Sequence, residues 1–393
     1  MTGSVNRMKS DQHFMRLALE LAGTANGKTN PNPVVGALIV KDGQVVGAGV
    51  HRNAGEPHAE VHAFKMAEGY TEDATLYVTL EPSPQSSPCI EFVLNSGIAR
   101  VVVAMQDPNP MVAGRGIQLL REHGIEVDVG VLGKEAELLN ERFVHNMSKR
   151  RPFIISQVAM TLDGKIATST GHSKWVTCDE TQLVVHKLRN KVDAILVGIN
   201  TVLADDPLLT TRLPEESGKN PIRVILDSNL RLPEDAKVTD CSAAKTWVVT
   251  KEDADPERVR MLQQKGIEIL FVPVNRYGLD LHALSDMLYQ RGVTDLLVEG
   301  GSEVNGSFLR ANLIDKWMIY IAPKVLGGRK SISPYAGSDL ELMDEALRVK
   351  IHSVQQIGED ICITAYPNDD SSASGSTYVI DYLNEELTTL SSS

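Results

Sequence analysis

A histidine, a glutamate and a cysteine share one stretch of the chain in a pattern suited to metal-assisted hydrolysis. His58 and Glu60 follow Pro57 at the expected start of a helix, and Cys89 follows a proline at the expected start of the next helix. A histidine and cysteine thiolates can hold Zn²⁺, which lowers the pKa of a bound water, while a glutamate outside the metal shell moves protons. His58 alone would more simply be an ordinary hydrogen-bonded side chain, so the metal-site interpretation depends on the whole pattern.

The blocks of sequence around these residues resemble a known family. They are NPVVGALIV at 32–40, HAEVHAF at 58–64, YVTLEP at 77–82, PC at 88–89, GIARVVVAMQDPNP at 97–110 and GRGI at 114–117. In this order they are similar to the deaminase half of the bifunctional riboflavin-biosynthesis deaminase/reductases. The resemblance implies a cytidine-deaminase-like domain in which His58 and Cys89 bind zinc and Glu60 is the proton shuttle. It also places Asn32, Asp107 and Asn109 at positions that contact the pyrimidine and ribose.

The chain departs from this family pattern at the third zinc ligand. The family has a cysteine directly after L-E-P, whereas Ser83 stands there in this sequence, and the loop to Cys89 lacks a histidine and a basic residue that hold the substrate. A serine hydroxyl stays protonated at neutral pH and is a poor zinc ligand. The substitution favours a deaminase domain kept as a remnant. The alternative is an active deaminase whose zinc is completed by another donor, such as His51 or His62.

The second half resembles the reductase half of the same family. The matching blocks are TLDGKIAT at 161–168, SKW at 173–175, ILVGINTVLADDPLLTTR at 195–212, IRVILD at 222–227, VEGGSEVNGSF at 298–308 and YIAPKVLGG at 320–328. The resemblance implies a dihydrofolate-reductase-like domain that uses NADPH. Its substrate would be a phosphorylated pyrimidine–ribose, 5-amino-6-(5-phosphoribosylamino)uracil, whose ribosyl side chain is reduced to the ribityl product.

The same resemblance carries site residues onto this chain. Cofactor-binding positions are Ala159, Trp175, Thr201, Asp205, Ser228 and the run Gly301, Ser302, Glu303, Val304, Asn305, Gly306 and Ser307. Substrate-binding positions are Ser173, Arg189, Leu209, Arg212 and Glu299. None of these positions breaks the family pattern.

Elementary chemistry supports several of these assignments without fixing them. Gly301 at a strand end would let backbone N–H groups approach a pyrophosphate, although an ordinary strand-to-helix turn has the same pattern. Arg189 and Arg212 have forked donors that suit a phosphate, although either can be a surface arginine. Asp205 or Glu299 can position a proton for the reduced carbonyl, and the sequence does not choose between them.

Helix and strand patterns alternate through both halves and must position these residues. Over 10–150 they predict a mixed sheet covered by helices, and over 151–367 a second α/β domain. The predicted fold class is therefore α/β with two domains. Residues 1–9 are expected to be a loose leader. The serine- and acid-rich residues 368–393 have too little apolar content to pack and are expected to be disordered.

Composition limits the functional classes. The net charge of −12 argues against nucleic-acid binding, and hence against a deaminase acting on nucleic acid. No apolar run approaches the ~20 residues of a membrane span, and the N-terminus lacks the apolar core of a signal peptide. Four widely separated cysteines fit a reducing cytoplasm. A cytoplasmic homo-oligomeric enzyme without nucleic-acid or membrane partners is expected, and a catalytically silent binding protein is the remaining alternative.

Overall fold

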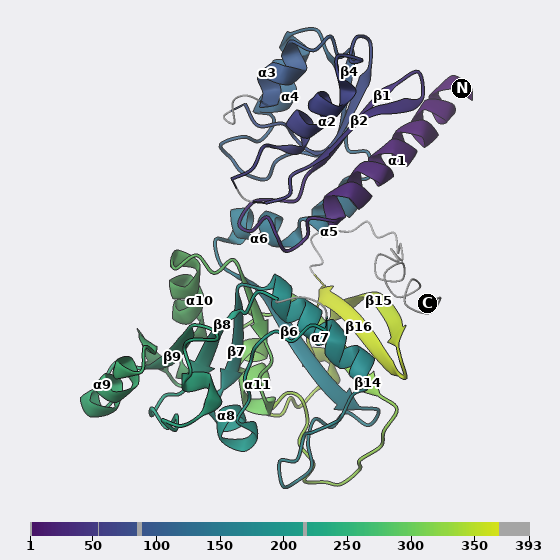
Figure 1. Cartoon of the computed structure of the whole chain (residues 1–393). Helices are drawn as coiled ribbons and strands as arrows, with labels where there is room; N and C mark the ends of the chain where they lie inside the picture. Colours follow the sequence, from purple (N-terminus) through teal and green to yellow (C-terminus); the bar gives the residue numbers. More distant parts are fainter. Residues whose placement is uncertain (1, 54, 85–88, 215–217, 369–393) are drawn as a thin grey trace. The chain divides into compact units, whose positions relative to one another are not determined.

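The chain forms two compact units, Met1–Pro152 and Phe153–Ser393, and the sequence is divided between them two residues after the expected boundary at 150/151. The computed structural model describes residues 2–53, 55–84, 89–214 and 218–368, except for the side chains of residues 2–6 and Cys89. Both units consist of a sheet with helices, which confirms the predicted α/β class (Figure 1). The tail expected to be disordered lies outside the described residues beyond Asn368.

The first unit is built on a five-stranded sheet in the order β2-β1-β3-β4-β5. Its strands are β1 (Gly36–Lys41), β2 (Gln44–Val50), β3 (Thr75–Leu80), β4 (Arg100–Met105) and β5 (Glu126–Val129). β1 runs antiparallel to β2 and β3, whereas β3, β4 and β5 are parallel. The sheet is therefore mixed, as predicted.

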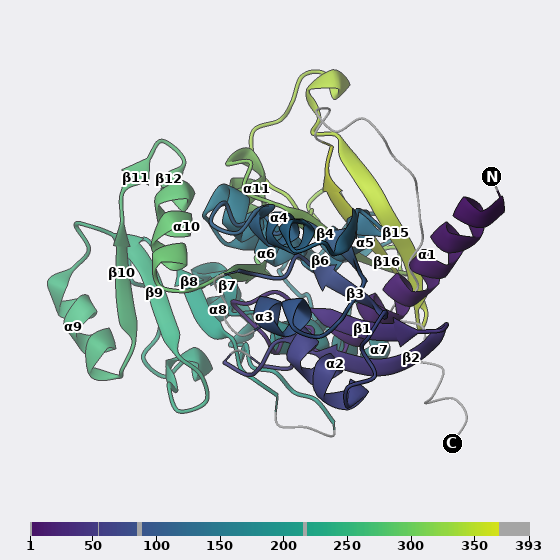
Figure 2. The same cartoon turned by 90° about the horizontal axis from the view of Figure 1, so that it is seen from above.

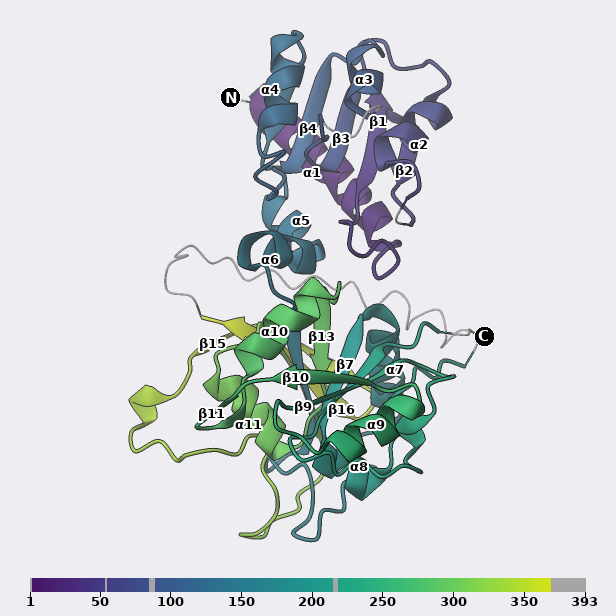
Figure 3. The ribbon, with the colours of Figure 1, turned by 90° about the vertical axis from the view of Figure 1, so that its left-hand side faces the viewer.

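Helices cover both faces of this sheet. They are α1 (Thr2–Gly23), α2 (Ala59–Ala67), α3 (Cys89–Leu94), α4 (Arg115–Glu122), α5 (Gly133–Leu139) and α6 (Glu141–Lys149). Successive strand residues point to opposite faces, so Leu76 joins the core under α2, α3 and α4 while Tyr77 joins the core under α1 and α5. The unit thus has three layers, with α1 behind the sheet in Figure 3.

Helix α1 begins at Thr2, so the expectation of a loose leader over 1–9 is wrong for residues 2–9. Arg7 pairs with two carboxylates on β5. One turn farther on, Asp11 accepts two hydrogen bonds from the Arg100 guanidinium, at 2.8 and 2.7 Å. These partners lie far away in sequence, which is why the polar N-terminal segment gave no local sign of being anchored.

The second unit is built on a nine-stranded sheet in the order β10-β9-β8-β7-β13-β6-β14-β16-β15. Its strands are β6 (Phe153–Thr161), β7 (Ala194–Gly198), β8 (Ile222–Leu226), β9 (Thr246–Lys251), β10 (Glu268–Val272), β13 (Asp295–Val298), β14 (Lys316–Ala322), β15 (Val349–Ile357) and β16 (Asp360–Pro367). The strands from β10 to β14 are parallel, and β16 and β15 are added antiparallel. β11 (Val274–Asn275) and β12 (Gly278–Leu279) form a small hairpin beside α10 (Figure 2).

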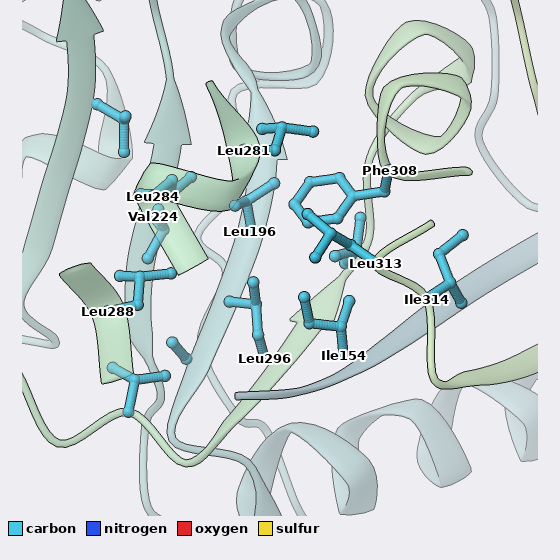
Figure 4. Close-up of a cluster of buried hydrophobic side chains, with 14 of the residues drawn as sticks. Ile154, Leu196, Val224, Leu281, Leu284, Leu288, Leu296, Phe308, Leu313 and Ile314 are labelled. Carbon is cyan, nitrogen blue, oxygen red and sulfur yellow. The ribbon is translucent and has the colours of Figure 1, made fainter. Parts of the chain in front are cut away.

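Helices also cover both faces of the second sheet. They are α7 (Asp179–Lys191), α8 (Ile199–Asp205), α9 (Pro256–Gln264), α10 (Leu281–Gln290) and α11 (Ser302–Arg310). Leu284 and Leu288 of α10 and Phe308 of α11 pack on one face, against Leu196 and Leu296 of the central strands (Figure 4). Residues of α7, α8 and α9 pack on the other face. Among the described helices, none combines the length and hydrophobicity needed to cross a bilayer.

Candidate functional site

Helix α2 is held close to β2 because two residues of that strand lack side chains. A Cβ atom at Gly49 would lie 2.0 Å from the Ala59 carbonyl oxygen, and one at Gly47 would lie 2.3 Å from the Ala63 carbonyl oxygen. Only glycine permits this approach, so the strand fixes the position of the N-terminus of α2. The predicted residues His58 and Glu60 lie at that N-terminus.

Glu60 is the buried acid of the first unit. Its side chain is only 2 % exposed, and its Oε2 atom makes no hydrogen bond within the described part of the chain. Burial raises the pKa of Glu60, opposed by a backbone hydrogen bond and by the nearby His51. Burial also lowers the pKa of His58, which favours the neutral imidazole. A buried acid with a raised pKa suits the predicted proton shuttle.

His51 lies against His58, which the sequence did not indicate. The two rings are 5.5 Å apart between centroids, and His51 is buried. Its Nδ1 atom lies 3.3 Å from the Pro57 carbonyl oxygen, which favours a proton on Nδ1 and a free lone pair on Nε2. The Nε2 atoms of His51 and His62 make no hydrogen bond with any described residue.

The described donors do not fit a zinc site. Ser83 supplies a hydroxyl where a thiolate would be needed, and Cys89 begins α3 with a side chain outside the described atoms. Among the described side chains, no three histidine, cysteine, aspartate or glutamate groups are placed together to hold a metal ion. Zinc sites need several deprotonated ligands acting together. No step in the first unit can therefore be assigned to a metal on these residues.

Glu81 has a structural role that sequence inspection missed. Its carboxylate accepts backbone N–H groups from Asp107 at 3.1 Å, Gly114 at 2.9 Å, Gly116 at 2.9 Å and Ile117 at 3.2 Å. These bonds join the end of β3 to the turn after β4 and to the N-terminus of α4. The predicted substrate position Asp107 is therefore fixed by its backbone, and burial raises the pKa of its side chain.

The second unit contains a cavity of about 420 Å³ at the carboxyl ends of its central strands. It brings together predicted cofactor and substrate residues from distant parts of the chain. Those that line it are Ala159, Ser173, Trp175, Thr201, Asp205, Glu299, Gly301 and Asn305. The predicted residues that do not line it are Arg189, Leu209, Arg212, Ser228, Ser302, Glu303, Val304, Gly306 and Ser307. Parallel sheets commonly bind ligands at this edge.

The N-terminus of α11 opens into this cavity and fits a pyrophosphate. Gly301 is the N-cap residue and gives no side-chain cap, so the first backbone N–H groups of α11 remain available for an anion. A Cβ atom at Gly301 would project to 3.7 Å from Thr201 Oγ1 on the opposite wall. Asn305 is buried, and its Oδ1 atom makes no hydrogen bond to a described group. Gly306, by contrast, packs tightly on the Ala336 backbone and has a structural role.

Glu299 is held in the cavity wall by Arg189. The guanidinium donates to both carboxylate oxygens, at 2.7 and 2.5 Å, and to the Thr210 carbonyl oxygen at 3.3 Å. Burial opposes the charge of Arg189, but Glu299 raises its pKa. Arg189 was expected to bind a substrate phosphate together with Arg212. In the structure its forked donors bind the Glu299 carboxylate instead.

His186 adjoins this ion pair and was not predicted. Its Nδ1 atom accepts a hydrogen bond from the Arg212 backbone N–H at 3.2 Å. Burial, together with the charges of Arg189 and Arg212, lowers the pKa of His186 to about 4. A neutral imidazole therefore braces the segment that carries Arg212.

Trp175 is 70 % exposed and lines the rim of the cavity, so it is not a core residue. Its backbone has a φ of 65°, and its carbonyl oxygen accepts a hydrogen bond from Lys324 Nζ at 2.7 Å. The same amine donates to the Val176 carbonyl oxygen at 2.9 Å. A lysine two residues beyond β14 thus holds the segment that presents the indole.

Comparison with known proteins agrees with the division of the chain into two units. Residues 8–105 match the cytidine and deoxycytidylate deaminase zinc-binding region, and residues 152–363 match the RibD C-terminal domain. The riboflavin biosynthesis protein RibD of Aquifex aeolicus is 44 % identical over 357 residues, covering 90 % of this chain and 97 % of that protein. The Escherichia coli protein of the same name is 38 % identical over 371 residues, covering 90 % and 98 %.

Solved structures show the same likeness. Acinetobacter baumannii RibD superposes with a TM-score of 0.81 at 36 % identity, covering 92 % of this chain and all of that one. A Thermotoga maritima diaminohydroxyphosphoribosylaminopyrimidine deaminase/5-amino-6-(5-phosphoribosylamino)uracil reductase gives a TM-score of 0.79 at 37 % identity, covering 92 % and 99 %. The predicted family is confirmed by this agreement across both units. The chain belongs to the RibD family of riboflavin-biosynthesis enzymes, with a deaminase-type first unit and a reductase second unit.

Proposed function

We propose that the second unit reduces the ribosyl side chain of 5-amino-6-(5-phosphoribosylamino)uracil to the ribityl product with NADPH. The supporting observation is the cavity that joins Trp175, Asp205 and Glu299 to an uncapped helix N-terminus at Gly301. Bound NADPH supplies the hydride, and the protein orients the reactants. The exposed Trp175 indole is placed to cover a flat ring, and the α11 N-terminus to hold a pyrophosphate.

Asp205 is the better candidate for handling the proton. Ser173 Oγ donates to Asp205 Oδ2 at 3.4 Å, whereas Glu299 accepts from two nitrogens of the charged Arg189 guanidinium. A carboxylate whose two oxygens both accept from a guanidinium has less freedom to turn an oxygen towards the reacting carbonyl than one that contacts a single hydroxyl. We therefore assign proton delivery to Asp205 and substrate positioning to Glu299.

A direct absorbance assay of NADPH consumption tests the reductase proposal. Purified protein, NADPH and the pyrimidine substrate should give loss of the cofactor absorbance, and an Asp205→Asn variant should lower kcat by roughly 10²- to 10⁴-fold. A Glu299→Gln variant should act mainly on KM. Absence of turnover would reject the proposal. If the second unit binds NADPH, cofactor at 100 times its Kd should raise the free energy of unfolding by about 2.7 kcal/mol. A catalytically silent protein that does not bind NADPH would show no such stabilisation.

We infer that the first unit is a deaminase remnant. Ser83 cannot replace a thiolate, and the described donors do not form a metal site. The alternative is a bifunctional enzyme whose zinc is held by His58, Cys89 and another donor. His51 is the best placed substitute, because its buried Nε2 makes no described hydrogen bond and its ring lies beside that of His58.

Zinc content decides between these possibilities. We expect well below one zinc per chain and no deamination, and a Ser83→Cys variant should raise zinc content because it adds a thiolate. About one tightly bound zinc per chain would support the bifunctional alternative, provided that His58→Ala and His51→Ala each remove the metal. Glu60→Gln is the matched control, because it changes the proton shuttle and leaves the proposed ligands intact.

We also propose that the enzyme is a cytoplasmic homo-oligomer that binds neither nucleic acid nor membranes. The acidic net charge of −12 supports the absence of a nucleic-acid partner. Light scattering on the purified protein measures the assembly state, and a monomeric mass would contradict this part of the proposal.

A further inference from the structure

Gln157 of β6 is a buried carboxamide in the wall of the cavity of the second unit. The residue is only 9 % exposed, and it lines the cavity. No described residue is hydrogen-bonded to its amide group. A buried amide without a partner is unfavourable, because it has lost its hydrogen bonds to water, and buried polar groups are therefore almost always paired. The Gln157 amide is thus available to a ligand in the cavity.

Strand register places Gln157 beside Glu299. Ser156 pairs with Val298 in the parallel ladder of β6 and β13, so the residues that follow them, Gln157 and Glu299, are neighbours about 4.8 Å apart. Neighbours across a ladder point to the same face of the sheet, and the Glu299 carboxylate binds Arg189 of α7. Gln157 therefore faces α7 as well.

Helix α7 supplies a second carboxamide to the same cavity. Gln182 lines it from a position one turn before Val185, and Val185 packs in one buried cluster with Ala159 of β6. Ala159 follows Gln157 by two residues and so lies on the same face of the strand. The Gln182 side chain also has no hydrogen-bond partner among the described residues. Two unpartnered amides, one from the sheet and one from the helix that covers it, thus line one cavity.

The third carboxamide that lines the cavity is engaged by the backbone. Asn305 Nδ2 donates to the carbonyl oxygens of Gly300 and Pro334, at 3.0 and 3.2 Å. Its donor group is therefore used within the protein. Gln157 and Gln182 are the lining carboxamides whose donor and acceptor are both free.

A free carboxamide is complementary to a flat edge on which a carbonyl stands beside an N–H group, because both hydrogen bonds can form in one plane. The pyrimidinedione ring of the proposed substrate has such edges. We propose that Gln157, assisted by Gln182, hydrogen-bonds the carbonyl and N–H groups of this ring and so selects the pyrimidine. The place of Gln157 beside Glu299, a substrate position by family resemblance, favours the substrate over the nicotinamide amide of the cofactor. This inference rests on the proposed reductase function.

Steady-state kinetics on the full chain tests the assignment with a Gln157→Met variant, because methionine keeps the size of glutamine without its hydrogen bonds. The KM for the pyrimidine substrate should rise roughly tenfold to hundredfold, with a smaller change in kcat, because binding in the ground state and the transition state is lost alike. The KM for NADPH and the Kd of ribose 5-phosphate, which lacks the ring, should stay within about twofold. Gln264→Met, at an exposed position on α9, is the matched control and should behave like the wild type.

The melting temperature separates this assignment from a structural role. The free Gln157→Met protein should melt at the wild-type temperature or above it, because an unpartnered buried amide is replaced by an apolar group. Binding of 2′,5′-ADP, the half of NADPH without nicotinamide, should be unchanged and shows that the second unit is folded. Gln182→Met, at a half-exposed helix position, gives an independent test and should raise the KM for the pyrimidine by a smaller factor.

The outcomes also separate this inference from the proposed function. An unchanged KM for the pyrimidine in both variants, or a rise confined to the KM for NADPH, would overturn the Gln157 assignment while the reductase proposal stands. Failure of Gln157→Met to fold would do the same, since an amide that is free in the folded chain contributes nothing to its stability. A wild-type protein that does not reduce the substrate would overturn the reductase proposal and this inference with it.

Discussion

His186 shows how one side chain is shaped by its charged neighbours. It lies beside Arg189 and Arg212 and accepts a backbone N–H through Nδ1. A protonated ring would lose that acceptor and repel both guanidinium groups. The fold therefore requires a neutral imidazole at this position.

This requirement predicts a pH effect on stability. The pKa of His186 is about 4 in the folded chain against its ordinary value of 6.5, so the unfolded chain takes up the proton first as the pH falls. Stability should therefore decline from pH 6.5 towards pH 4, and His186→Gln should flatten this decline. Urea unfolding of the second unit at several pH values measures the effect. The exposed His282→Gln is the control, and parallel curves for wild type and His186→Gln would contradict the prediction.

Among the secondary-structure elements, strand β8 holds two loops together through the buried Arg223. Its guanidinium donates to the carbonyl oxygens of Leu208, Asp240 and Ala244, at 3.5, 2.7 and 2.5 Å. The side chain is fully buried, and burial lowers its pKa. β8 thereby holds the loop before Leu209, a predicted substrate position, against the loop before β9.

Arg223→Met should destabilise the second unit by about 3 kcal/mol, because buried carbonyl groups lose their donors. The loss should appear in urea unfolding followed by circular dichroism. Arg260→Met, at an exposed position on α9, should change stability by no more than about 0.5 kcal/mol. If Arg223→Met also changed stability by no more than about 0.5 kcal/mol, water would have to satisfy the carbonyl groups that lose the guanidinium.

A second link between elements runs from β14 to the rim of the cavity. Removing the Lys324 amine in Lys324→Met should free the Trp175 segment and raise the Kd for NADPH roughly threefold to tenfold. Iodide quenching should also increase, because Trp247 and Trp317 are buried and Trp175 dominates the accessible fluorescence. Lys330→Met is the exposed control. Unchanged quenching and affinity would show that the segment keeps its position without Lys324.

The sequence predicted local elements better than distant partnerships. Strands such as β7 and β4 are runs of buried apolar residues, and their type could be recognised directly. The hairpin of β15 and β16 was not predicted, because β15 is an edge strand with mostly exposed, mixed residues. The engagement of Arg189 by Glu299 joins positions far apart in the chain, and no local pattern indicates it. Family resemblance brought many of the cavity residues together, but it did not indicate His51, His186 or Lys324.

At the scale of the whole molecule, each unit has cores of its own. Phe308 and Leu196 belong to a cluster drawn entirely from the second unit, and Leu76 and Val103 to one drawn entirely from the first. The division lies between Pro152 and Phe153. A core that is complete within one segment supports independent folding.

Residues 151–393 expressed alone should therefore fold and bind 2′,5′-ADP with a Kd within about twofold of that of the full chain, because the cavity lining lies wholly in this unit. Calorimetry and thermal unfolding measure both properties. An aggregated fragment, or one that has lost nucleotide binding, would show that the reductase unit depends on its neighbour.

The cavity wall is assembled from β6, the loop before α7, α7 itself, α8 and the segment at the N-terminus of α11. No single one of these described elements supplies the whole lining. Unfolding of any of these elements should weaken dinucleotide binding, and a saturating nucleotide should slow proteolysis within them. Nucleotide binding therefore also reports whether these elements are folded, so a mutation far from the cavity should weaken binding when it unfolds one of them.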